Sequence, residues 1–181
     1  MIEIMLPPNV LFAHYESCLF SAMFSFAFFF GLRVSEITKS LHNIKLSQIK
    51  IDNNSLLLNF LSYKHSTSHD PPHVFKSLNT SFCPVFLLNA YLLHRPNIGL
   101  ETPLFVLNDK AVSSTNFNKH LKKVIKHLGL NEKSFSSHSF RIGAINHWNS
   151  KSLSELQVKQ LGRYRSNALY CYMRNAISHS I

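Results

Sequence analysis

The segment from Cys18 to Leu32 constrains the fold most, because almost every residue in it is apolar and phenylalanine recurs through it. It is shorter than the roughly 20 residues that an α-helix needs to span a bilayer. It also follows Glu3 and Glu16, which places it too far into the chain for a secretory signal peptide. We therefore expect a helix over residues 10 to about 30 that is buried on most sides, with no membrane as a partner.

The remaining pattern predicts a mainly α domain with a small three-stranded antiparallel β-sheet, an α+β fold. After Gly31 interrupts the apolar helix, residues 33–41 are expected to form a short helix. Short apolar or alternating runs between turn residues predict three strands, at 46–51, 56–63 and 73–78. Apolar residues at helical spacing predict the later helices, at 84–94, 113–128, 137–148, 154–161 and 166–176.

Composition fits one domain of ordinary size that attracts a polyanion. The chain has 181 residues, of which 45% are hydrophobic and only 15% are charged, so it can bury a substantial core. Lys and Arg number 19 against 9 Asp and Glu, which gives a formal net charge of +10. Nucleic acid is the first candidate partner for such a body, and a basic protein without a specific partner is the plain alternative.

The cysteines and histidines lack the spacing typical of a metal site. The three cysteines form no CxxC pair, which argues against a zinc site and against a disulfide framework. His65, His69 and His73 recur every four residues, but a Pro-Pro pair interrupts any helix that would place them on one face. The sequence therefore predicts no metal and no other cofactor, in a reducing compartment.

Three separated segments carry residues suited to phosphate chemistry. The first is GLRVSE at 31–36, directly after the apolar helix. The second is HSFR at 138–141, which places a histidine and an arginine on one face of a helix. The third is LGRYRSNALYCY at 161–172, in which Tyr172 comes ten residues after the Leu-Gly pair. Each segment is weak by itself, since a lone Arg33 is commonly a surface partner of Glu36 and a lone tyrosine is commonly a core residue.

In order and spacing, the three segments together resemble the tyrosine recombinase (phage integrase) family. Arg33 and Arg141 match its two conserved arginines, His138 its His-x-x-Arg histidine, and Tyr172 its nucleophile. The form GRYRS followed by YMR is similar to recombinases of eukaryotic mobile elements, such as the DIRS-like and Crypton groups. The resemblance implies a single catalytic domain over 1–181, without the N-terminal domain of roughly a hundred residues that clamps DNA in the family.

The resemblance also assigns supporting residues. Lys64, in the turn after the second predicted strand, matches the family's lysine better than Lys76, because an active-site cation needs the reach of a hairpin tip. Glu36 is expected to be a buried partner that orients Arg33. Where many members carry His or Trp after the glycine, this chain has Arg163 and then Tyr164. Either side chain could fill that place beside the phosphate.

The chemistry of phosphodiester cleavage fits these residue types. Arginine forks pair bidentately with phosphate and keep their charge, so Arg33 and Arg141 would neutralise the nonbridging oxygens. A tyrosine hydroxyl is a poor nucleophile while protonated, and His138 would take its proton. Lys64 would protonate the departing 5′ oxygen. The product would be a 3′-phosphotyrosyl link that another DNA end can reverse.

Further basic residues suggest how double-stranded DNA would be held. Phosphate contacts are expected on one helical face and within the third motif, from Lys119, Lys122, Lys123, Lys126 and Arg165. We expect site-specific recombination or integration, with other recombinase subunits on the same DNA and a nuclear location in a eukaryote or a cytoplasmic one otherwise. The alternatives are a non-catalytic DNA-binding relic, a type IB topoisomerase-like relaxing enzyme and, more distantly, an unrelated helical interaction protein.

Overall fold

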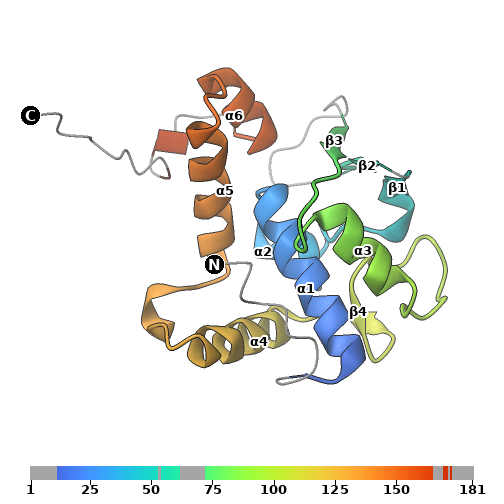
Figure 1. Cartoon of the computed structure of the whole chain (residues 1–181). Coiled ribbons are helices and arrows are strands. Elements are labelled where there is room, and N and C mark those ends of the chain that lie inside the picture. The colour runs from blue at the N-terminus through green and yellow to red at the C-terminus, as the bar shows by residue number, and fades with distance from the viewer. Residues whose placement is uncertain (1–11, 53, 62–71, 165–168, 171, 173–181) are drawn as a thin grey trace, which may run out of the picture.

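A computed structural model describes residues 12–52, 54–61, 72–164, 169–170 and 172. Helix α1 (His14–Phe29) runs through the centre of the molecule, and nine of its residues are buried. Figure 1 shows α3 (Pro84–Leu92) on one side of it and α5 (His138–Ser150) on the other. Within the described part of the chain, no helix is long and apolar enough to cross a membrane. The apolar segment is therefore a core helix, as its length predicts.

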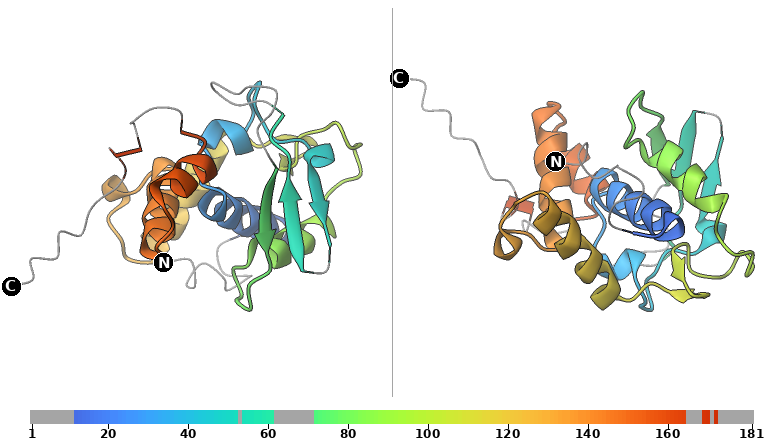
Figure 2. Two further views of the ribbon diagram at one scale, coloured as in Figure 1. Left: turned by 90° about the horizontal axis from the view of Figure 1, so that it is seen from above. Right: turned by 60° about the horizontal axis from the view of Figure 1, so that its bottom comes forward.

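Three short antiparallel strands form the sheet, in the order β1 (Ile49–Ile51), β2 (Ser55–Leu58) and β3 (His73–Lys76). Lys50 pairs with Leu57, and Leu57 with Val74. The sheet and α3 lie together on one side of α1, opposite α5 and α6 (Figure 2). Leu56 and Leu58 of β2 are fully buried, so one face of the sheet joins the core.

The structure corrects two sequence-based boundaries. The first predicted strand begins as a 3-10 turn, η2 (Leu46–Gln48), because the Gln48 side chain accepts a hydrogen bond from the Lys45 backbone at 2.9 Å. Helix α2 (Val34–Ile37) has one turn instead of the predicted 33–41. It ends early because the Lys39 backbone N–H donates to the Val112 carbonyl, 2.7 Å away, instead of continuing the helix.

A second hairpin, β4 (Val106–Leu107) and β5 (Lys110–Ala111), was not predicted. Its two-residue turn places Asn108 and Asp109 at φ of 51° and 58°, the conformation that short hairpins favour. The Asn-Asp pair is therefore the signal in the sequence that marks this hairpin.

The remaining helices lie close to the predicted positions. They are α4 (Ser114–His127), α5 and α6 (Glu155–Leu161), with a further 3-10 turn, η3 (Glu132–Ser134). Ser113 caps α4 by accepting a hydrogen bond from the Asn116 backbone at 3.0 Å. Most of the helix predicted at 166–176 lies outside the described residues.

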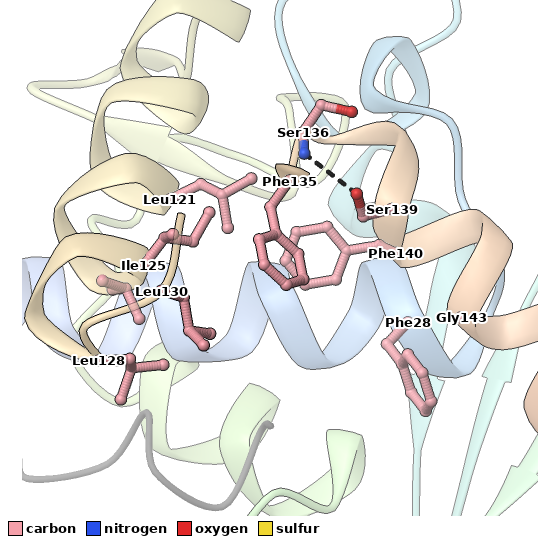
Figure 3. Close-up of a pocket in the computed structure, with 11 residues that line it drawn as sticks. Phe28, Leu121, Ile125, Leu128, Leu130, Phe135, Ser136, Ser139, Phe140 and Gly143 are labelled. Atoms are coloured by element: carbon pink, nitrogen blue, oxygen red, sulfur yellow. Dashed lines mark hydrogen bonds between the residues drawn. The ribbon is translucent and has the colours of Figure 1, made fainter. Parts of the chain in front are cut away.

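An apolar cavity of about 170 Å³ lies between α4 and α5, next to Phe28 of α1 (Figure 3). The aromatic rings of Phe135 and Phe140 lie beside Leu121 and Ile125 there. Its lining carries no titratable side chain, so we assign it to packing.

Among the residues that the structure describes, the buried side chains form two clusters of unequal size. The larger one surrounds α1 and includes residues from α3, β2 and α4. The smaller one joins α5 and α6 through Ala144, Ile145, Trp148, Val158 and Leu169. Tyr164 and Tyr172 pack against this smaller cluster.

Candidate active site

The site is built where the C-terminal ends of α1 and α6 meet. Helix α1 ends in a Schellman motif: the Leu32 backbone N–H donates to Ala27 at 2.9 Å and that of Gly31 to Phe28 at 3.1 Å. Gly31 has φ +54°, and a Cβ atom there would lie 2.5 Å from the Trp148 ring. Glycine is required both for the turn and for the closeness of α5, and the turn leaves the Gly31 carbonyl free to accept side-chain hydrogen bonds.

Helix α6 ends in the same motif, with an arginine where glycine is usual. The Tyr164 backbone N–H donates to Lys159 at 2.9 Å, that of Arg163 donates to Gln160 at 3.0 Å, and Arg163 has φ 54°. A non-glycine residue in this left-handed conformation costs roughly 1–2 kcal/mol. The contacts of the Arg163 side chain offset that cost.

Arg163 and Glu36 form a buried ion pair that joins the third motif to the first. Their closest atoms, Nη2 and Oε2, lie 2.7 Å apart, and the side chains are 2% and 1% exposed. The Arg163 guanidinium also donates to the Phe30 carbonyl at 3.2 Å and stacks 4.1 Å from the centre of the Phe60 ring. Burial alone would raise the pKa of Glu36, but the charge of Arg163 and the backbone N–H of Arg33 outweigh it and lower that pKa. Glu36 is therefore a carboxylate at neutral pH.

Arg141 joins all three motifs. Its Nε donates to the Tyr164 hydroxyl at 2.8 Å, and its two terminal nitrogens donate to the carbonyls of Gly31 and Gly162. The residue is only 2% exposed. Burial, followed by the nearby charges of Arg163 and Arg33, lowers the pKa of Arg141 to about 10, so it stays protonated at neutral pH.

Arg33 is the more accessible of the two motif arginines. Its side chain is 26% exposed and one guanidinium nitrogen lies 3.3 Å from Glu36 Oε1. Its backbone N–H donates to Glu36 Oε2 at 2.7 Å, which fixes the start of α2. Glu36 thus contacts Arg33 as predicted, but its shorter side-chain contact is with Arg163.

Three aromatic rings continue the site toward solvent. The Tyr172 ring centre lies 5.0 Å from that of His138 and 5.5 Å from that of Tyr164. His138 is the exposed first residue of α5. Partial burial and then the charges of Arg141 and Arg33 lower the pKa of His138, so its ring is neutral at pH 7. A neutral imidazole beside a tyrosine ring is suited to accept a proton.

The structure thus brings together residues from opposite ends of the chain, as the motifs predicted. Arg33, His138, Arg141, Tyr164 and Tyr172 form one neighbourhood, while Lys64 and Arg165 lie outside the described residues. The four predicted lysines of α4 are all exposed and face away from its buried side, consistent with a solvent-facing basic surface.

Sequence reasoning missed the backbone acceptors and the burial of the arginines. The carbonyls of Gly31 and Gly162 receive Arg141, and three of its N–H donors are already engaged within the protein. Arg163 was an open candidate for contact with phosphate, but its charge is directed inward to Glu36. Tyr164 is the less buried member of that pair and lies beside Tyr172.

Comparison with known proteins gives the fold. No family model matches the sequence, and no curated protein matches it. Two solved structures of the XerH site-specific recombinase bound to difH substrates resemble it, a pre-cleavage and a post-cleavage complex, both with TM-scores of 0.73. They are 14% and 15% identical, and the match covers 96% and 94% of this chain. The mainly helical fold with its small sheet is that of a tyrosine recombinase catalytic domain.

The chain spans about half the length of the proteins that it matches. The matched regions are 47% and 46% of the two XerH chains. At 14% and 15% identity, the similarity shows a shared fold. It does not show that this chain has the activity of the whole recombinase.

Proposed function

We propose that this chain is the catalytic domain of a site-specific DNA recombinase, with Tyr172 as the nucleophile. The observation that carries the proposal is the contact of the Tyr172 ring with both His138 and Tyr164, the latter hydrogen-bonded to Arg141. The sequence separates Tyr172 from Arg33 by most of the chain, and only folding brings these groups together. A packed core alone does not require two arginines, a histidine and a tyrosine in one place.

In the proposed reaction, the Tyr172 oxygen attacks a DNA phosphorus and the bond to the 5′ oxygen breaks. Neutral His138 takes the phenol proton. Arg33, which is partly exposed, holds a nonbridging oxygen. Arg141 adds positive charge from its buried position next to the site. Lys64 gives a proton to the departing 5′ oxygen, which leaves as a hydroxyl. The 3′-phosphotyrosyl link that results is resolved by attack of another 5′ hydroxyl, which gives back the tyrosine.

Tyr164 is proposed as the residue that takes the place of the family's His or Trp. Its hydroxyl contacts Arg141 Nε, and its ring contacts Tyr172, so it lies between the buried arginine and the proposed nucleophile. Arg163, by contrast, positions the first motif through Glu36. We assign the chain to the recombinase type of eukaryotic mobile elements on its GRYRS and YMR segments, with double-stranded DNA and further recombinase subunits as partners.

One observation favours a second function, a DNA-binding module without catalysis. Arg141 is buried and its three engaged donors all meet protein acceptors. An arginine of this kind can be kept for folding alone. Catalysis requires a remaining N–H of Arg141, or its charge at short range, to reach the phosphate.

Covalent capture distinguishes these functions. The full chain is incubated with a pool of duplexes that carry randomised sequence and a nick, so that cleavage releases a short strand and traps the enzyme. We expect a detergent-resistant protein–DNA adduct that Tyr172→Phe abolishes. Tyr170→Phe is the matched control, since Tyr170 is exposed and its hydroxyl contacts Glu155.

The outcomes are separable. An adduct that survives Tyr172→Phe would overturn the assignment of the nucleophile. DNA binding with no adduct at any salt concentration would establish the non-catalytic module instead. Relaxation of a supercoiled plasmid without strand exchange would indicate a topoisomerase.

A further inference from the structure

A group of metal-ligating side chains lies where α1 begins and α3 ends. His14 and Cys18 are four residues apart on α1 and therefore share a face of that helix. His94 follows the end of α3, which packs along α1. One ligand atom from each of His14, Cys18 and His94 lies within 4.8 Å of the others.

The distances are close to those that a tetrahedral ion imposes. The Nε2 atoms of His14 and His94 lie 3.2 Å apart, and Cys18 Sγ lies 3.9 Å from His14 Nε2. With metal–nitrogen bonds of about 2.0–2.1 Å and a metal–sulfur bond of about 2.3 Å, tetrahedral geometry requires nitrogen atoms roughly 3.3 Å apart and nitrogen and sulfur roughly 3.6 Å apart. The third pair, Cys18 and His94, has its ligand atoms within 4.8 Å, so the side chains need to close by about an ångström at most to complete the match.

The donor set selects the class of ion. Two imidazoles and a thiolate are borderline and soft ligands, which favour Zn²⁺ and its neighbours over Mg²⁺ or Ca²⁺. Three protein ligands leave a fourth position for water. Because His14 and His94 are exposed and Cys18 is partly exposed, an ion can enter from solvent.

We propose that His14, Cys18 and His94 bind one Zn²⁺ ion, which fastens the start of α1 to the end of α3. The sequence shows no metal-binding spacing for this site, because the third ligand, His94, comes from the turn after α3, far along the chain from the other two. The 16 residues of α1 span about 24 Å, so the ion would lie at the opposite end of that helix from Gly31 and Arg33. The inference is therefore independent of the proposed catalysis.

In this proposal, the bound Zn²⁺ ion stabilises the folded chain. A ligand that binds only the folded state raises its stability in proportion to the logarithm of the free concentration over Kd. At a hundredfold excess over Kd, a Zn²⁺ ion should raise the Tm of a chain of this size by about 5–10 °C. The alternative is a simple hydrogen bond between two neutral imidazoles, with no affinity for a metal.

Cobalt provides the spectroscopic test. The untagged full chain, reduced and stripped with a chelator, is titrated with Co²⁺. We expect saturation at one equivalent, with the visible spectrum of a four-coordinate ion and a near-ultraviolet thiolate-to-cobalt band, and loss of both on addition of Zn²⁺. His94→Ala should lose stoichiometric binding, and Cys18→Ser should lose the thiolate band.

Matched variants keep the test falsifiable. His127→Ala removes another exposed histidine, at the end of α4, and should leave the titration unchanged. Circular dichroism of each metal-free variant separates a lost ligand from a lost fold. No thiolate band in the unchanged chain, a band that persists in Cys18→Ser, or equal binding by His94→Ala would each overturn the proposal.

Discussion

The carboxylate of Glu36 lies 2.7 Å from the guanidinium of Arg163, and both side chains are almost completely buried. The two residues are 127 positions apart in the chain, so the pair fastens α2, which follows the turn after α1, to the turn after α6. Those turns also hold Gly31 and Gly162, whose carbonyls receive Arg141. The position of the central arginine of the site therefore depends on this pair.

Glu36→Gln should lower the free energy of unfolding by about 3–5 kcal/mol, because it leaves the Arg163 charge buried without its carboxylate. Urea denaturation at pH 7 measures the change. Glu155→Gln, which disrupts an exposed pair with Lys159, is the control and should change stability little. An equally small effect at Glu36 would contradict the importance of the buried pair.

The same pair predicts how stability depends on acid. The pKa of Glu36 is lowered in the folded chain from its ordinary value of 4.5. Its contribution to stability is therefore fully present above about pH 4.5 and is lost as the pH falls through the folded pKa. The difference in stability between the unchanged chain and Glu36→Gln should accordingly shrink in acid.

Gly31→Ala should destabilise the fold by about 2–4 kcal/mol, the sum of left-handed backbone strain and overpacking against Trp148. Gly129→Ala is a matched control, because Gly129 ends α4 in the same Schellman motif with φ +66° and no atom within 4 Å of an added Cβ. Thermal unfolding measures the loss of stability in each variant. The loss in Gly31→Ala beyond that in Gly129→Ala reports how closely α1 and α5 pack. Equal costs at the two glycines would show that α5 moves aside without penalty.

The proposed role of His138 predicts the pH profile of adduct formation. Its pKa is lowered below 6.5, so the neutral base persists at pH 7 and the rate should fall only as the pH drops below about 6.5. His138→Ala should slow single-turnover adduct formation by about a hundredfold or more and remove that fall. His127→Ala should leave the profile as it is. A profile unchanged in His138→Ala would exclude His138 as the base.

The exposed lysines of α4 predict how DNA affinity depends on salt. Each phosphate contact contributes about 0.9 to the slope of log affinity against log salt concentration. Lys122→Ala should therefore weaken binding to all sequences alike and reduce that slope by about 0.9. Lys110→Ala, an exposed change on β5, is the control. If Lys122→Ala leaves the slope unchanged, Lys122 makes no phosphate contact and the α4 lysines are a solvated surface.

Local patterns in the sequence were enough for much of the fold. The phenylalanines of α1, the apolar spacing of α4 and the glycine after each of these helices follow from short-range preferences, and the structure bears them out. The early end of α2 is different, because a hydrogen bond from Lys39 to Val112 decides it. Lys39 and Val112 are far apart in the sequence, so no local stretch of residues could have indicated this hydrogen bond.

The candidate site also has features that the sequence predicted and features that depend on the folded structure. The resemblance of the three motifs to the tyrosine recombinase family, in order and spacing, led to the expectation that Arg33, His138, Arg141 and Tyr172 are neighbours. The inward direction of Arg163 could not be predicted, since its φ of 54° turns the chain where a helix-ending glycine is usual. The cluster of His14 and His94 likewise depends on the packing of α1 against α3.

Tyr172 packs against the smaller of the two hydrophobic clusters, which contains five buried residues. Opening that cluster exposes far less apolar surface than unfolding the body around α1, so it requires less free energy. Tyr172 can therefore separate from its neighbours at a lower cost in free energy than unfolding of the rest of the domain. In the reaction proposed above, transfer of a DNA end between partners would use that freedom, because the covalently held strand would move with the tyrosine.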